Sequence, residues 1–221
     1  LVSIFFNNEF YENKEQYLYA LADALKVEYD AIYKSKFVLQ VDCPDLTMSG
    51  WDRLNYSFKE LNKLRELHIE AMNYALRDIP EDQIRLHLCW GNYEGPHHCD
   101  VSLSDIIDIA FKANVSGISF EAANPRHAHE YTIFDDVKVP DHVVLIPGVI
   151  ESKSNFIEHP DLIAQRIERM ARRVGREQLI VGSDCGFGTW VGQAAVEPDI
   201  VWAKFAAMTQ GARIASERLW S

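Results

Sequence analysis

The strongest constraint on the fold is an alternation along the whole chain. Short apolar runs rich in β-branched residues alternate with longer segments whose apolar residues recur at helical spacing. The runs of strand length are residues 36–41, 84–89, 117–121, 143–149 and 179–182, and the helical segments are 14–34, 52–77, 104–113, 160–174 and 198–219. Successive runs end about 30 to 45 residues apart, close to the length of a strand–helix–strand unit. The pattern therefore predicts a parallel sheet built from five βα units.

Two architectures fit such units, an open doubly wound sheet and part of an eight-stranded barrel. Chemically active side chains favour the barrel, because Asp42, His87, Glu121 and Asp184 all fall at the carboxyl ends of predicted strands. The active sites of barrels gather at that end of the strands. No run is followed by Gly-x-Gly-x-x-Gly or by a P-loop, which removes the main support for nucleotide binding. No linker or repeat divides the sequence, so we expect one domain.

The net charge of the chain limits the classes of partner that it can bind. Of 221 residues, 22 are Lys or Arg and 33 are Asp or Glu, which gives a net charge of -11. Such a chain repels phosphate backbones and anionic lipid head groups, so we expect no nucleic-acid partner. The sequence holds no run of 18 apolar residues, and we expect a soluble protein without a membrane span.

The cysteines indicate a reducing compartment. Four cysteines in a chain of 221 residues, without a cleavable leader, do not resemble a secreted disulfide framework. We therefore expect a cytoplasmic protein. The chain opens on Leu1 rather than Met, and we expect its first residues to lie inside a longer polypeptide.

A metal site is the sharpest prediction from the strand ends. Residues two apart in a strand point to the same side, so His87 and Cys89 are expected to project together. Glu121 from the next strand and Cys185 after the last strand add a carboxylate and a second thiolate. Zinc accepts this set of four ligands, and soft thiolates favour zinc over magnesium or calcium.

A structural role is the simpler interpretation for each of these residues taken singly. Buried cysteine is a common small core residue, and a histidine at a strand end is usually only hydrogen-bonded. Cys43 next to Asp42 is expected to pack in the core, because strand alternation turns it away from the side that Asp42 faces. The cluster at residues 97–100 is expected to form a substrate-facing or structural loop. Arg126 is placed to grip a carboxylate.

Four segments resemble strand-end motifs of a known family, in the same order. They are residues 87–98 (HLCWGNYEGPHH), 119–124 (SFEAAN), 146–150 (IPGVI) and 182–188 (GSDCGFG). The family is the cobalamin-independent methionine synthases, and in particular the shorter relatives that keep only the catalytic barrel. The resemblance covers nearly the whole chain. It implies an α/β fold, a (β/α)8 TIM barrel to which this chain supplies roughly the C-terminal five βα units. Residues 1–221 would then be a single catalytic-type barrel domain whose N-terminal strands are missing.

The resemblance also implies a ligand set. In that family, zinc is held by the His and Cys of a His-x-Cys motif, by a Glu one strand later and by a Cys near the last strand. These positions correspond to His87, Cys89, Glu121 and Cys185, the same residues that the strand pattern brings together.

Asp42 and the position of Lys153 are carried over by the same resemblance, and three more residues complete the candidate site. Asp42 corresponds to an Asp that contacts the amino group of homocysteine, although Cys43 stands where the family's Asp-Glu-Pro motif has Glu. Lys153 occupies the place of a histidine thought to act as an acid in methyl transfer, and Asp184 joins it as a candidate catalytic residue. Asn92 and Arg126 are expected to bind substrate.

The function expected from this resemblance is zinc-dependent transfer of a methyl group onto a thiol such as homocysteine, in methionine biosynthesis. Folate as the methyl donor stays open, because Lys153 replaces the histidine. One alternative is a zinc-dependent alkyltransferase that adds a thiol to an epoxide or another alkyl donor. A second is a non-catalytic zinc-binding accessory protein. The expected partners are a small-molecule thiol and a methyl or alkyl donor, and a homo-oligomer is possible.

Overall fold

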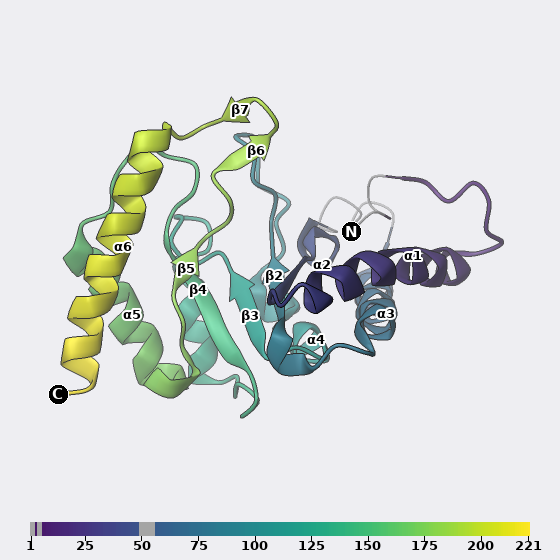
Figure 1. Ribbon diagram of the computed structural model, residues 1–221, viewed down its shortest axis with the longest axis horizontal. Coiled ribbons are helices and arrows are strands. Elements are labelled where there is room, and N and C mark those ends of the chain that lie inside the picture. The colour runs from purple at the N-terminus through teal and green to yellow at the C-terminus, as the bar shows by residue number, and fades with distance from the viewer. Residues whose placement is uncertain (1–2, 4–5, 49–55) are drawn as a thin grey trace. The chain divides into compact units, whose positions relative to one another are not determined.

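The structure is a computed structural model that describes residue 3 and residues 6–48 and 56–221. Its internal contacts divide the chain into two compact units. The first comprises Leu1–Trp90 and His97–Ile118, and the second comprises Gly91–Pro96 and Ser119–Ser221. Figure 1 labels the helices and strands of both units. Each unit is described by itself.

The first unit is built from a parallel strand pair and the helices around it. Its elements are α1 (Lys14–Lys34), β1 (Leu39–Asp42), α2 (Pro44–Thr47), α3 (Phe58–Leu76), the 3-10 turn η3 (Glu81–Gln83), β2 (Ile84–Leu88), the 3-10 turn η4 (Leu103–Asp105) and α4 (Ile107–Ala110). β1 and β2 pair in parallel, with Leu39 opposite Ile84 and Asp42 opposite His87. The division between the units passes through β3 (Gly117–Phe120).

Side-chain caps fix where the two long helices of this unit begin. The Asn13 side chain accepts a hydrogen bond from the backbone N–H of Gln16 at the start of α1. Ser57 and Glu60 form a reciprocal capping box at the start of α3. The helices then pack against each other through small and aliphatic residues (Figure 1), namely Leu18, Ala22, Ala71 and Ala75.

The second unit repeats the strand–helix pattern. Its elements are the 3-10 helix η5 (Glu130–Asp135), β4 (Val144–Ile150), α5 (Pro160–Val174), the 3-10 turn η6 (Arg176–Gln178), β5 (Gly182–Ser183), β6 (Gly188–Trp190), β7 (Gln193–Ala194) and α6 (Pro198–Leu219). β4 and β5 pair in parallel, with Gly148 opposite Gly182. β6 and β7 pair in antiparallel.

The helices α5 and α6 lie side by side (Figure 1) because Gly211 allows a close approach. A Cβ on Gly211 would stand 2.6 Å from the Cβ of Ile163. Ile163 and Ala164 of α5 are buried with Ala207 and Ala215 of α6 in one apolar cluster. Tight packing of small against branched residues therefore joins this helix pair.

Most of the predicted helices are confirmed. Segments 14–34, 160–174 and 198–219 are helical with those limits. The predicted helix 52–77 is observed as α3, and residues 52–55 lie outside the described residues. The prediction of one helix over 104–113 is wrong. Ile106 has a φ of -130°, which separates the short η4 from the four-residue α4.

The five predicted strands are found in the predicted order as β1 to β5, with small shifts in their limits, and the two short strands β6 and β7 are additional to them. Each of the first four overlaps an observed strand, β1 to β4. The fifth is displaced, because the strand pair forms at Gly182 and Ser183 while Leu179 makes an isolated parallel bridge with Leu145. No helix in the described part of the chain is both long enough and apolar enough to cross a membrane.

Candidate functional site

The first unit carries three predicted site residues at the ends of β1 and β2. Asp42 and His87 are direct partners across the strand pair, and the backbone N–H of Cys43 donates to the carbonyl of His87 over 2.9 Å. Cys89 follows β2 and is buried, as is His87. The Thr47 hydroxyl donates to the Cys89 carbonyl. Hydrogen bonds from the chain after β1 thus hold the end of β2.

Asp42 and Cys43 have opposite environments. Asp42 is exposed at the end of β1. Nearby protein atoms still remove part of the water around its carboxyl, and this raises the pKa of Asp42. The charge on His87 acts in the opposite direction and lowers the pKa. Cys43 is buried with its Sγ 3.7 Å from the Sδ of Met72, and burial raises the pKa of its thiol. The expected core role of Cys43 agrees with this placement.

In the second unit, Glu121 directly follows β3 and its carboxylate is buried. The side-chain amide of Asn124 donates to Glu121 Oε2 over 2.7 Å. The guanidinium of Arg126 donates to the same oxygen, also over 2.7 Å. Arg126, predicted to grip a carboxylate of the substrate, therefore already holds a carboxylate of the protein.

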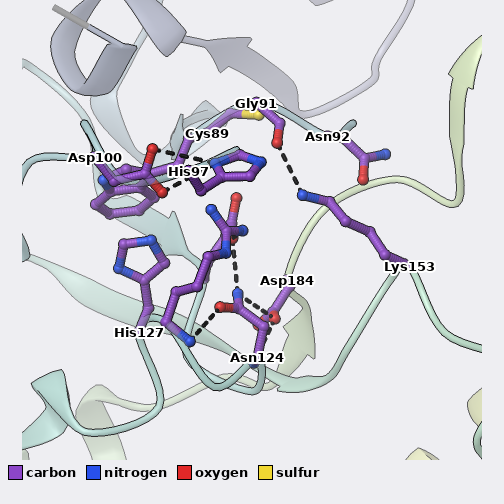
Figure 2. Close-up of polar contacts among 12 residues, drawn as sticks. Cys89, Gly91, Asn92, His97, Asp100, Asn124, His127, Lys153 and Asp184 are labelled. Carbon is purple, nitrogen blue, oxygen red and sulfur yellow. Dashed lines mark hydrogen bonds and ion pairs between the residues drawn. The ribbon is translucent and has the colours of Figure 1, made fainter. Parts of the chain in front are cut away.

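Asp184 directly follows β5 and is 1% exposed. Its Oδ1 accepts the backbone N–H groups of Ala122 and Ala123, and its Oδ2 accepts both the backbone and the side-chain N–H of Asn124, all over 2.8 Å. Figure 2 shows the Asn124 side chain next to Asp184. Burial, and then the nearby charge of Glu121, raise the pKa of Asp184 to about 6, against the effect of these hydrogen bonds.

The other predicted site residues of this unit lie on loops. Lys153 follows β4, and its Nζ donates to the carbonyl of Gly91 over 2.9 Å (Figure 2). The side chain of Asn92 donates to the carbonyl of Gly186 over 2.5 Å. The carbonyl of Cys185 accepts the Ser183 hydroxyl over 2.9 Å. Asn92 and Lys153 thus attach the 91–96 segment to the loops that follow β5 and β4.

Several buried or partly buried polar pairs were not predicted from the sequence. Asn124 is the most important, because it contacts both Glu121 and Asp184. Three histidines also pair with carboxylates: His68 with Asp45 at 2.7 Å, His97 with Asp100 at 3.0 Å and His127 with Glu130 at 2.8 Å. The i,i+3 spacing of the last two pairs was a signal available in the sequence.

The sequence profile of the family described as "Cobalamin-independent synthase, Catalytic domain" matches residues 5–207. The chain belongs to this family. Membership in the cobalamin-independent synthase family confirms the resemblance drawn from the strand-end motifs, and the matched range includes every predicted site residue.

Curated relatives cover much of the chain at low identity. A methionine synthase from Thermococcus kodakarensis is 25% identical over 213 residues, which cover 96% of this chain and 54% of that protein. A 2-hydroxypropyl-CoM lyase from Xanthobacter autotrophicus is 26% identical over 176 residues, which cover 68% of this chain and 45% of the lyase. The chain spans about half the length, or less, of the curated relatives it matches.

A solved structure of similar fold is a B12-independent methionine synthase from Shewanella sp. W3-18-1 in complex with selenomethionine. It matches with a TM-score of 0.74 at 17% sequence identity, over 96% of this chain and 58% of that chain. The likeness confirms the predicted α/β fold. The closed eight-stranded barrel, and the single domain spanning residues 1–221, stay predictions.

Proposed function

We propose that this chain is part of a zinc-dependent enzyme that transfers a methyl group onto a thiol such as homocysteine. The observation that carries the proposal is the family match over residues 5–207, which includes the His-x-Cys motif, Glu121 and Cys185. A relative named methionine synthase, aligned over 96% of the chain, supports the same chemistry.

The residues fit zinc by their chemistry. His87 and Cys89 lie in the first unit at the end of β2, and Glu121 and Cys185 follow β3 and β5 in the second. One imidazole, one carboxylate and two thiolates make a tetrahedral set that zinc accepts. When bound, zinc would lower the pKa of a substrate thiol and keep it as the nucleophilic thiolate.

Asp42 and Arg126 are proposed to bind the amino-acid part of the thiol substrate. The exposed carboxylate of Asp42 at the end of β1 suits a substrate ammonium group. Arg126 donates to Glu121 through Nη2, and the planar guanidinium with its five donors suits a substrate carboxylate as well. Asn92 is proposed to contact the substrate from the neighbouring loop.

Lys153 is proposed to supply a proton from Nζ to the methyl donor as the bond to the methyl group breaks. An ammonium has three N–H donors, and the carbonyl of Gly91 accepts one of them. In this transfer the sulfur–carbon bond of the product forms, the carbon–donor bond breaks, and the leaving atom of the donor takes the proton.

A second candidate function has its own support, the similarity to a 2-hydroxypropyl-CoM lyase over 68% of this chain. The chain would then add a thiol to an epoxide. The sulfur–carbon bond forms as a ring carbon–oxygen bond breaks, and the ring oxygen takes a proton to become a hydroxyl. Lys153 would supply that proton from the same Nζ.

Product analysis distinguishes these functions. The purified, zinc-loaded protein is incubated with homocysteine or with coenzyme M, in the presence of a methyl-folate or of epoxypropane, and thioether products are identified by mass spectrometry. We expect methionine from homocysteine and the methyl donor. A hydroxyalkyl thioether alone would favour the second function. Bound zinc without any thiol-dependent product would overturn both and favour an accessory role.

A further inference from the structure

One carboxylate connects the two loops that carry the proposed zinc ligands of the second unit. Glu121 begins the loop after β3, and Cys185 is in the loop after β5, directly next to Asp184. Asp184 accepts hydrogen bonds from the three successive backbone N–H groups that follow Glu121. The position of the Glu121 loop is therefore set from the residue adjacent to Cys185.

Asn124 extends this connection to the carboxylate of Glu121 itself. The side-chain amide of Asn124 donates to Asp184 Oδ2 over 2.8 Å and to Glu121 Oε2 over 2.7 Å. A primary amide has two N–H bonds, so both acids are held by one group. Oε2 of Glu121 accepts this amide and also the Arg126 guanidinium, and the two donors restrict the orientation of the carboxylate.

The surroundings allow Asp184 little freedom. Gly148 of β4 lies so close that a Cβ there would stand 2.7 Å from the Cα of Asp184. The Arg166 guanidinium donates to the carbonyls of Val149 and Ala123, so it joins the end of β4 to the loop after Glu121. Strand β4 thus limits the position of Asp184, and Arg166 holds the loop after Glu121.

We propose that Asp184 is a positioning residue that sets the spacing and orientation of Glu121 and Cys185 for the zinc ion. This inference rests on the proposed function, since it assumes that both residues bind zinc. It replaces the catalytic role predicted for Asp184 from the sequence. A carboxylate that is 1% exposed and accepts four N–H donors is placed to hold a loop rather than to meet a substrate.

The test is the zinc affinity of Asp184→Asn, measured by competition with a chromophoric chelator. The substitution keeps the shape of the side chain but sets an NH2 group against N–H donors of Asn124. We expect zinc affinity about 10- to 100-fold weaker than that of the wild type. X-ray absorption at the zinc edge should show a changed set of light-atom neighbours.

Two further variants separate positioning from general loss of stability. Asp45→Asn alters another buried carboxylate, in the first unit, so it should lower stability while leaving zinc affinity at the wild-type value. Asn124→Ala removes the side-chain connection to Asp184 and Glu121, together with the acceptor of the Arg126 backbone N–H, but keeps the backbone N–H groups bonded to Asp184, so it should weaken zinc binding less than Asp184→Asn. If Asp184→Asn does not fold, the zinc affinity of Asn124→Ala decides whether the connection positions the zinc ligands.

The outcomes are distinct. A wild-type protein that binds no zinc would overturn the proposed function, and this inference with it. A wild-type protein that binds zinc, with unchanged affinity in Asp184→Asn and in Asn124→Ala, would overturn the positioning role alone. An equal loss of zinc affinity in Asp45→Asn would also overturn it.

Discussion

Gly148 of β4 lies directly against Asp184, the residue that follows β5. A Cβ at residue 148 would stand 2.7 Å from both the Cα and the backbone nitrogen of Asp184, closer than real Cβ contacts come. The backbone of β4 and β5 would have to separate to admit a side chain. Glycine in the Ile-Pro-Gly-Val segment is therefore required by a close approach, and it allows Asp184 to reach the loop after Glu121.

This relationship predicts the effect of Gly148→Ala. We expect it to destabilise the protein by about 1 to 3 kcal/mol, as overpacked cores do, and to weaken zinc binding because Asp184 is displaced. Thermal unfolding and a zinc competition assay measure the two effects. The matched control is Gly186→Ala in the loop that carries Cys185, where a Cβ meets nothing within 4 Å. Equal stability of the two variants would contradict the prediction.

The buried Asp45–His68 pair predicts a dependence of stability on pH. Burial is the largest single influence and raises the pKa of Asp45, but the hydrogen bond with His68 and the further lowering contributions, among them the charge of His68, together outweigh it and lower the pKa to about 2, below the ordinary value of 3.8. The stability gained from ionised Asp45 is therefore fully present above the ordinary pKa and is lost as the pH falls through the folded pKa. The loss amounts to about 2 kcal/mol.

Urea unfolding of the wild type and of Asp45→Asn measures this contribution. Asp45→Asn has no carboxyl to titrate at this position, so the difference in unfolding free energy between the two proteins should be largest near about pH 5 and should shrink toward about pH 2.5. A difference that stays constant or grows as the pH falls would show that Asp45 is not stabilised as a carboxylate.

Substitution of Lys153 should slow methyl transfer without loss of bound zinc. Lys153→Met keeps most of the apolar stem and removes Nζ, so we expect the transfer rate to fall roughly 100- to 10,000-fold, the usual range for a lost general acid. Zinc content should not change. Lys153→Arg keeps a cation that can reach the carbonyl of Gly91 but holds its proton too tightly, so it should also be slow. Wild-type turnover in either variant would exclude Lys153 as the proton donor.

Much of the fold follows from the sequence because its helices are clearly delimited. Pro160 and Pro198 occupy the first turns of α5 and α6, where a missing N–H costs nothing. Gly175 follows α5 with a φ of 86°, a conformation that favours glycine. These local signals act within a few residues, so they can be recognised without knowledge of the tertiary structure.

The predicted fold differs from the structure in segments whose conformation depends on tertiary contacts rather than on local sequence. Residues 104–113 have apolar residues at helical spacing, but Ile106 adopts a φ of -130° and the segment divides into two short turns. The β6–β7 hairpin was not predicted at all. Its strands have three and two residues, too few for an alternating pattern to be recognised.

The candidate site could be predicted in its strand-end residues but not in the contacts between them. The carboxyl end of a strand can be recognised in the sequence to within a residue or two, and Glu121 and Asp184 stand at such ends. Asn124 has no such signal. Its importance comes from a hydrogen bond to Asp184, 60 residues further along the chain, and only the fold brings these residues together.

Metal analysis of cysteine variants tests most directly whether four side chains bind one zinc ion. The purified protein and its Cys89→Ser, Cys185→Ser and Cys99→Ser variants are each loaded with zinc, dialysed and analysed for bound metal. Cys99 is partly exposed and is not a predicted ligand, so its variant is the matched control. We predict one zinc ion per chain in the wild type and in Cys99→Ser, and loss of bound zinc in Cys89→Ser and Cys185→Ser. A wild type without zinc, or full zinc retention in Cys89→Ser and Cys185→Ser, would contradict the account.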